Sequence, residues 1–153
     1  MPDPFNCHSR YPIKPRPHIL CVDDDAEILE SIAGALRRHF KVTIAQSAHA
    51  AIRMINSTES FDVVVSGLHF AAMDGIRFLS GISDNAPDTS VILLTGNGNL
   101  PAGIDAFNAG HVFLLCDEKC SSAQLIEAIT AGIERYDARR TERLLRLGLL
   151  SNF

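Results

Sequence analysis

The sequence predicts a doubly wound α/β domain, in which helices cover both faces of a parallel β-sheet. Three observations lead to this prediction. The chain has 153 residues, enough for one domain with a substantial core. Short apolar runs alternate five times with stretches whose apolar residues recur at helical spacing. Hydrophobic residues make up 46% of the chain, which is ordinary for a globular domain.

The first half of the chain predicts three strands, at residues 18–22, 41–45 and 62–66, because each is a short apolar run. The first predicted helix has apolar residues three or four positions apart: Ile28, Leu29, Ile32, Leu36 and Phe40. Asp24 with Glu27 resembles a cap for the start of that helix. Ser47 predicts the start of a second helix.

The second half predicts strands at residues 90–94 and 111–115, and three more helices. The first of these helices has an apolar face made of Ile76, Leu79 and Ile82. Pro101 suits the first turn of the next helix, and Gly110 suits its end. Ser121 and Gln124 predict a capping box for the last helix, which we expect to extend past Tyr136 towards Leu147.

Residues at the carboxyl ends of the predicted strands are the candidates for chemistry, because parallel α/β sheets bind ligands there. Asp23 and Asp24 follow the first strand, Gly67 follows the third and Thr95 follows the fourth. A pair of carboxylates is typical of a Mg²⁺ site, since Mg²⁺ takes oxygen ligands and keeps several waters.

Four stretches together resemble the receiver domain of two-component response regulators, over about residues 18–134. They are HILCVDDDAEIL, FDVVVSGLHFAAMDG, VILLTGNG and NAGHVFLLCDEKC. The resemblance implies a flavodoxin-like, five-stranded parallel sheet of strand order 2-1-3-4-5, here with an extended C-terminal helix. It also implies a role in phosphorelay signal transduction.

The family's functional positions are only partly matched. Asp23, Asp24 and Thr95 match the acid pair and the hydroxyl residue. Aligned without a gap, the phosphoacceptor aspartate falls on Gly67 and the switch aromatic on Leu115. The resemblance therefore implies a degenerate receiver, or pseudo-receiver.

The end of the fifth predicted strand departs from the family as well. The ungapped alignment puts the family's lysine on Glu118 and its proline on Lys119. A shift of one residue puts Lys119 in the lysine position, and both alignments remain open. Lys119 leaning into the pocket to offset part of the acidic charge also stays open, although alternation along a strand turns it away from the face that Glu118 occupies.

These substitutions change the expected chemistry. Gly67 has no carboxylate that can form an acyl phosphate, and Glu118 reverses the charge that stabilises a transferring phosphoryl group. We therefore expect a protein-binding module that is not phosphorylated at the usual site and is not an enzyme. The alternative is a working receiver with an atypical acceptor, although Asp62, Ser66 and Asp74 offer no convincing replacement.

The acid pair leaves two interpretations of metal binding open. Asp23, Asp24 and the backbone carbonyl of His69 hold a divalent cation weakly, or the acids are a remnant that caps the first helix. We favour the absence of a tightly bound metal, because Gly67 removes one carboxylate ligand.

The sequence also suggests an organisation and a set of partners. We expect a tail at 1–16, a receiver-like domain at 17–134, a helical extension at 135–153, and no output domain. The expected partners are a histidine kinase or an output-domain protein, and a second copy bound through the C-terminal helix is as plausible as that helix folding back. The net charge of -4 and the lack of a long apolar run predict no nucleic acid, no membrane and a cytoplasmic location.

Overall fold

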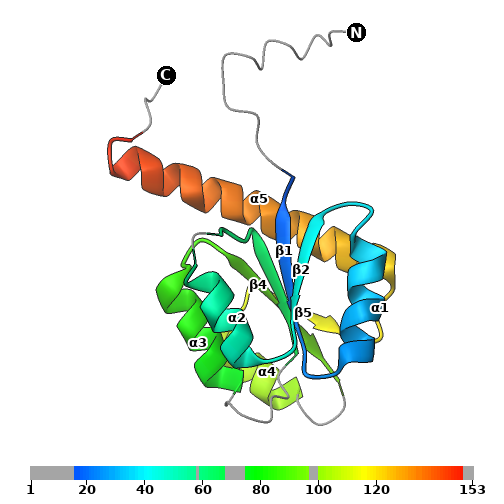
Figure 1. Ribbon diagram of the computed structural model, residues 1–153. Helices are drawn as coiled ribbons and strands as arrows, with labels where there is room; N and C mark the ends of the chain where they lie inside the picture. The colour runs from blue at the N-terminus through cyan, green and yellow to red at the C-terminus, as the bar shows by residue number, and fades with distance from the viewer. Residues whose placement is uncertain (1–15, 58, 68–74, 97–99, 150–153) are drawn as a thin grey trace, which may run out of the picture.

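A computed structural model describes residues 16–149 apart from 58, 68–74 and 97–99. The expected tail at 1–16 therefore lies outside the described residues except for its last one. Five strands form one parallel sheet in the order β2-β1-β3-β4-β5, as the resemblance implies (Figure 1). The strands are β1 (His18–Val22), β2 (Lys41–Ala45), β3 (Val63–Ser66), β4 (Ser90–Thr95) and β5 (Leu114–Asp117).

Helices cover both faces of this sheet, which confirms the predicted fold class (Figure 1). One face packs against α1 (Ala26–Leu36) and α5 (Ser122–Arg146). The other packs against α2 (Ala48–Ile55), α3 (Gly75–Asn85) and α4 (Leu100–Asn108). The side chain of Ile76, expected on the apolar face of α3, lies outside the described part of the chain.

The core divides into two layers because successive strand residues point to opposite faces. In β1, Leu20 and Val22 pack under the helices of the second face, whereas Ile19 and Cys21 pack against α1 and α5. All five residues of β1 are buried, as expected for a central strand of a parallel sheet.

Helix caps follow the sequence with one correction. Ser47 caps α2, and Ser121 with Gln124 forms the predicted capping box of α5. The cap of α1 is Asp25 rather than Asp24, since its side chain accepts the backbone N–H groups of Glu27 and Ile28. Asp24 is thereby left exposed at the end of the sheet.

The last strand also differs from its predicted position. It spans 114–117 rather than 111–115. Gly110 stands at the end of α4 with a φ of 84°, as predicted, and the N–H of His111 still bonds to the carbonyl of Ala106. The chain is therefore still turning at residue 111, and pairing with β4 begins later, at Leu114 opposite Ile92.

Helix α5 crosses the sheet and continues beyond it without a break (Figure 1). Gly132 permits the close crossing, because a Cβ there would lie 3.0 Å from Val63 Cγ2 and 3.3 Å from Ser90 Cβ. Near the helix end, Arg143 holds Asp88 through several hydrogen bonds of 2.9–3.2 Å. The extension therefore keeps contact with its own domain as far as Arg143, and residue 134 lies inside one continuous helix.

None of the helices within the described ranges combines the length and the apolar character needed to cross a membrane.

Candidate functional site

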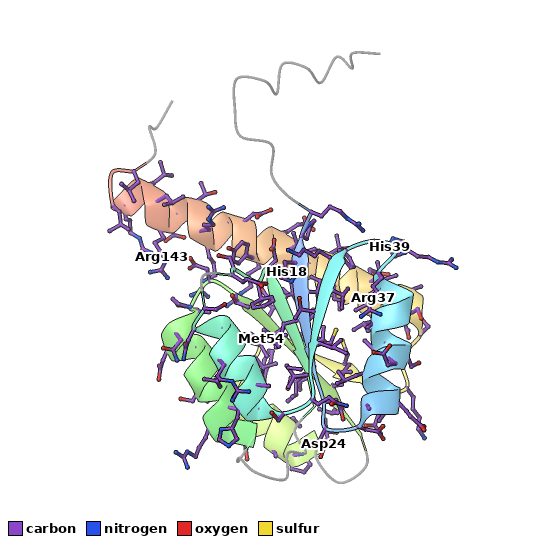
Figure 2. The ribbon with its side chains drawn as sticks, in the orientation of Figure 1. His18, Asp24, Arg37, His39, Met54 and Arg143 are labelled. Atoms are coloured by element: carbon purple, nitrogen blue, oxygen red, sulfur yellow. The ribbon has the colours of Figure 1, made fainter. Side chains whose placement is uncertain are left out.

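A cavity of about 600 Å³ opens at the carboxyl ends of β1, β3 and β4. Figure 2 shows Asp24 at this edge of the sheet, with His18 and Arg143 towards the opposite edge. The apolar wall of the cavity is made by Ile28 and Ile32 of α1 and Leu94 of β4. Its polar lining comprises Asp23, Asp24, Asp25, Glu27, Ser31, Gly67, Glu118 and Lys119.

Asp23 is the most constrained carboxylate of the cavity. Its N–H continues the pairing of β1 with β2 through the carbonyl of Ala45, and its Oδ1 accepts the N–H of Asp25 at 2.9 Å. Burial raises the pKa of the Asp23 carboxyl, and the charges of Asp24 and Asp25 raise it further. The hydrogen bond from Asp25 opposes this shift of the pKa only in part. The site therefore holds Asp23 in a position where its negative charge is disfavoured.

Gly67 lies directly beside that carboxylate. Its N–H bonds to the carbonyl of Val22, which joins the end of β3 to the end of β1. A Cβ at this position would lie 3.2 Å from Asp23 Oδ2, tighter than an ordinary contact. Any side chain introduced at residue 67 would therefore contact the Asp23 carboxylate through its Cβ.

Glu118 and Lys119 both line the cavity, so the expectation that alternation turns Lys119 away is wrong. The reason is that β5 ends at Asp117, and the two residues lie in the turn that follows. Glu118 bonds through its N–H to the carbonyl of Thr95, and its carboxylate lies against Gly96. The N–H of Lys119 bonds to Asp117 Oδ1 at 2.7 Å.

Thr95 and Leu115, the other two expected site residues, do not line the cavity. The Thr95 hydroxyl donates to the carbonyl of Cys116 at 3.4 Å. A Cβ added to Gly103 of α4 would meet Thr95 Cγ2 at 2.9 Å and Leu115 Cδ2 at 3.4 Å. Both side chains therefore pack beneath α4.

The charges of the cavity are unbalanced. Five carboxylates, from Asp23, Asp24, Asp25, Glu27 and Glu118, share the lining with one ammonium group, that of Lys119. Like charges about 4 Å apart repel by roughly 4 kcal/mol at an effective dielectric of about 20. The cavity is therefore suited to cations and unsuited to anions such as a phosphoryl group.

A divalent cation needs more oxygen ligands than Asp23 and Asp24 supply by themselves. Mg²⁺ prefers six oxygen ligands in near-octahedral geometry. Within the described residues, no group of three His, Cys, Asp or Glu side chains is arranged to hold a metal ion. No third carboxylate of the described cavity is placed to share a cation with Asp23 and Asp24, and His69, whose carbonyl is an expected ligand, lies outside the described residues. These residues do not fit a tight metal site.

Neither of the alternative phosphoacceptors that the structure describes, Asp62 and Ser66, lines the acidic cavity. Asp62 is buried at the amino end of β3, where its Oδ1 accepts the N–H of His18 at 3.2 Å, at the far edge of the sheet. Ser66 is fully buried, and its hydroxyl donates to the carbonyl of Gly67 at 2.7 Å. Asp74 lies outside the described part of the chain.

Sequence reasoning missed several lining residues. Glu27 was treated as part of a helix start and Asp25 was given no role, although three consecutive aspartates after a strand signalled a dense acidic edge. Ile28 was placed on the buried face of α1, but its side chain is 45% exposed and forms a wall of the cavity. Its position four residues before Ile32 was the signal for a second apolar face.

Comparison with known proteins extends this picture. Residues 19–136 match the response regulator receiver domain family. The chain is 31% identical over 127 residues to the transcriptional regulatory protein GlrR of Escherichia coli (strain K12), covering 82% of this chain and 28% of GlrR. It is 30% identical over 133 residues to the DNA-binding transcriptional regulator NtrC of Proteus hauseri, covering 84% of this chain and 28% of NtrC. The chain thus spans less than a third of these relatives.

A solved structure gives the same result for the fold. The response regulator receiver domain protein of Clostridium thermocellum superposes with a TM-score of 0.75 at 29% identity, covering 80% of this chain and 98% of that one. The order of the strands and the layers of helices are therefore those of a receiver domain.

The relatives correct the expected set of partners. The sequence predicted a kinase or output-domain protein or a second copy, and excluded nucleic acid on the basis of the net charge of -4. That prediction is wrong for this family, because its relatives are transcriptional regulators and NtrC is named as DNA-binding. The charge of a segment that covers 28% of such a relative carries no information about the rest of it.

Proposed function

The chain belongs to the response regulator receiver family, and on that premise we propose that it is a degenerate receiver, a signalling module that takes no phosphoryl group at the usual position. Gly67 carries the proposal: it occupies the end of β3 beside Asp23 and has no nucleophile. The surplus of carboxylates in the cavity supports the same conclusion, since it opposes the approach of a phosphodonor.

The packing beneath α4 supports a conformation that does not depend on phosphate. Thr95 bonds to the backbone of β5 instead of facing the cavity, and Leu115 is in contact range of α4. A phosphate-dependent switch needs groups that move when the phosphoryl group arrives, with two arrangements of similar free energy. Here Thr95 and Leu115 contact β5 and α4 rather than the groups that line the cavity.

The exposed face of α4 supports a role in protein binding. Leu100, Ile104 and Phe107 are spaced by four and three residues and are 49%, 44% and 45% exposed. Gly103 and Ala106 on the opposite side of the helix are buried. A row of large apolar side chains on one helix face is typical of a protein contact surface. We propose that the module acts through such a contact, in the cytoplasm and without catalysis of its own.

Bound Mg²⁺ has at most a minor part in this function. The proposal assigns Asp23 and Asp24 a weak, largely hydrated cation, because the described residues offer no third side-chain ligand. No step of the proposed function depends on it.

The test is the intact mass of the purified chain after incubation with acetyl phosphate and Mg²⁺. The proposal predicts no gain of a phosphoryl group. A stoichiometric gain would show a working receiver with an atypical acceptor, and mapping the modified residue would identify that acceptor.

A further inference from the structure

A second, much smaller cavity lies beneath α5 near the amino-terminal edge of the sheet, away from the acidic cavity. Its volume is about 110 Å³, and it is bounded by the loops before β4 and before β5 and by α5. Its polar lining comes from Ser83, Thr89, His111, Arg135 and Arg139. Drug-sized ligands occupy roughly 300 Å³ or more, so this cavity suits only a compact ion or a single functional group.

Arg135 is held in place before any ligand arrives. Its guanidinium lies over the ring of Phe113, 5.2 Å from the centroid, and donates to Ser90 Oγ at 3.2 Å. The Ser90 hydroxyl in turn donates to the carbonyl of Gly132 at 2.7 Å, and this bond fixes the Ser90 side chain against α5. A guanidinium has five N–H donors, and this bond uses one of them.

The positive charge around this cavity is not neutralised by its own lining. Arg139 lies one helical turn after Arg135, and its charge adds to burial in lowering the pKa of Arg135. Arg139 makes no ion pair within the described residues. Asp88, the carboxylate that acts on Arg135 from nearby, is held by Arg143 through both of its oxygens. The lining given by the described residues contains no carboxylate.

We propose that this cavity binds a tetrahedral oxyanion of the phosphate class between Arg135 and Arg139. The planar guanidinium matches such an anion with paired N–H donors. His111 adds a further polar group: its Nδ1 lies 3.2 Å from Ser83 Oγ, and among the described residues that is the hydrogen bond given for its ring. Inorganic phosphate and the phosphate group of a monoester share this chemistry.

The experiment is a titration of the full chain with inorganic phosphate at constant ionic strength, followed by amide chemical shifts. Binding at the cavity predicts saturable shifts in residues 110–113 and 135–139. We expect the Arg139→Gln variant to weaken binding roughly fivefold to tenfold, somewhat less than a buried hydrogen bond to a charged group would give, because Arg139 is exposed.

Arg140→Gln is the matched control. It removes the same charge from the next exposed residue of α5, but Arg140 lines a different cavity, beside His18 and Asp62. We expect its affinity for phosphate to equal that of the wild type. Equal weakening in both variants would overturn the proposal, because it would reflect attraction to the helix as a whole, and so would the absence of saturable shifts.

A parallel titration with O-phosphoserine distinguishes the two sources of the anion. Tighter binding of phosphoserine identifies a phosphate ester as the ligand, and binding of inorganic phosphate alone identifies the free ion. If neither compound gives saturable shifts at residues 110–113, the cavity is not an anion site and the proposal is wrong.

Discussion

The two edges of the sheet carry opposite surpluses of charge. At the carboxyl edge, five carboxylates share one cavity with Lys119. At the amino edge, arginines of α5 lie over the loops before β4 and β5. Asp88 forms an ion pair with one of these arginines, Arg143. Figure 2 shows Arg143 and His18 towards the end of the sheet opposite Asp24.

The two edges also differ in how their charged groups are held. At the amino edge, α5 is fixed by the bond from Ser90 to Gly132, by the stacking of Arg135 on Phe113 and by the ion pair to Asp88. At the carboxyl edge, Asp23 is held half-buried among like charges, which disfavours its ionised form. Raised carboxyl pKa values of this kind cluster at functional sites, and structural charge networks produce them as well.

The largest expected effect concerns the amino edge, where α5 crosses the sheet at Gly132. We expect Gly132→Ala to destabilise the fold by about 1–3 kcal/mol, because the new methyl group overpacks against Val63 and Ser90. Urea denaturation measures the change in the free energy of unfolding.

Gly34→Ala is the control for this substitution. Gly34 is also helical, but a Cβ there meets nothing within 4 Å, so the better helix propensity of alanine is expected to stabilise by about 0.5–1 kcal/mol. Equal stabilisation by both variants would show that α5 does not pack closely on the sheet.

A smaller effect is expected at the carboxyl edge. Asp23→Asn is expected to stabilise the fold at pH 7 by less than about 1 kcal/mol, since the residue is only half-buried. The folded-state pKa of Asp23 lies above its unfolded value, so the native state binds more protons and wild-type stability falls as pH rises through that window. The advantage of the variant should therefore shrink as the pH falls to about 4 and below.

Thermal midpoints of the wild type and the variant across pH 3–8 test this sign. Asp24→Asn, which removes an exposed carboxylate from the same loop, is expected to change stability less. A stabilising effect of Asp23→Asn that grows as the pH falls would contradict the assigned direction of the pKa.

The smallest expected effect is that of Mg²⁺. A ligand at a concentration near its dissociation constant stabilises by about 0.4 kcal/mol, so millimolar Mg²⁺ should raise the thermal midpoint by under about 2 °C. Asp23→Asn should remove this shift. A rise above about 5 °C would reveal a tight site that the described residues do not explain.

The fold was predictable because its signals are local. Strand β1 and strand β2 occupy the predicted residues, and the Ser121–Gln124 capping box starts α5 where expected. Strand β5 was misplaced because the length of the loop between Gly110 and the strand depends on pairing with β4. Such pairing is a tertiary effect that a short apolar run cannot report.

The site was predictable only in part. The sequence placed Asp23, Asp24 and Gly67 at one edge, since parallel strands end together there. It also placed Glu118 there but favoured Lys119 turning away, because it could not predict that β5 ends at Asp117. It also did not predict that Thr95 and Leu115 pack beneath α4, which depends on the approach of Gly103.

The most direct test of the account compares the wild type, Gly67→Asp and Gly67→Asp/Glu118→Lys by intact mass after incubation with acetyl phosphate and Mg²⁺. We expect no phosphoryl group on the wild type and little on the single variant, whose new carboxylate lies against Asp23 and still faces Glu118. The double variant should accept more, because Lys neutralises charge on the phosphoryl group. Phosphorylation of the wild type, or equal phosphorylation of both variants, would contradict the account.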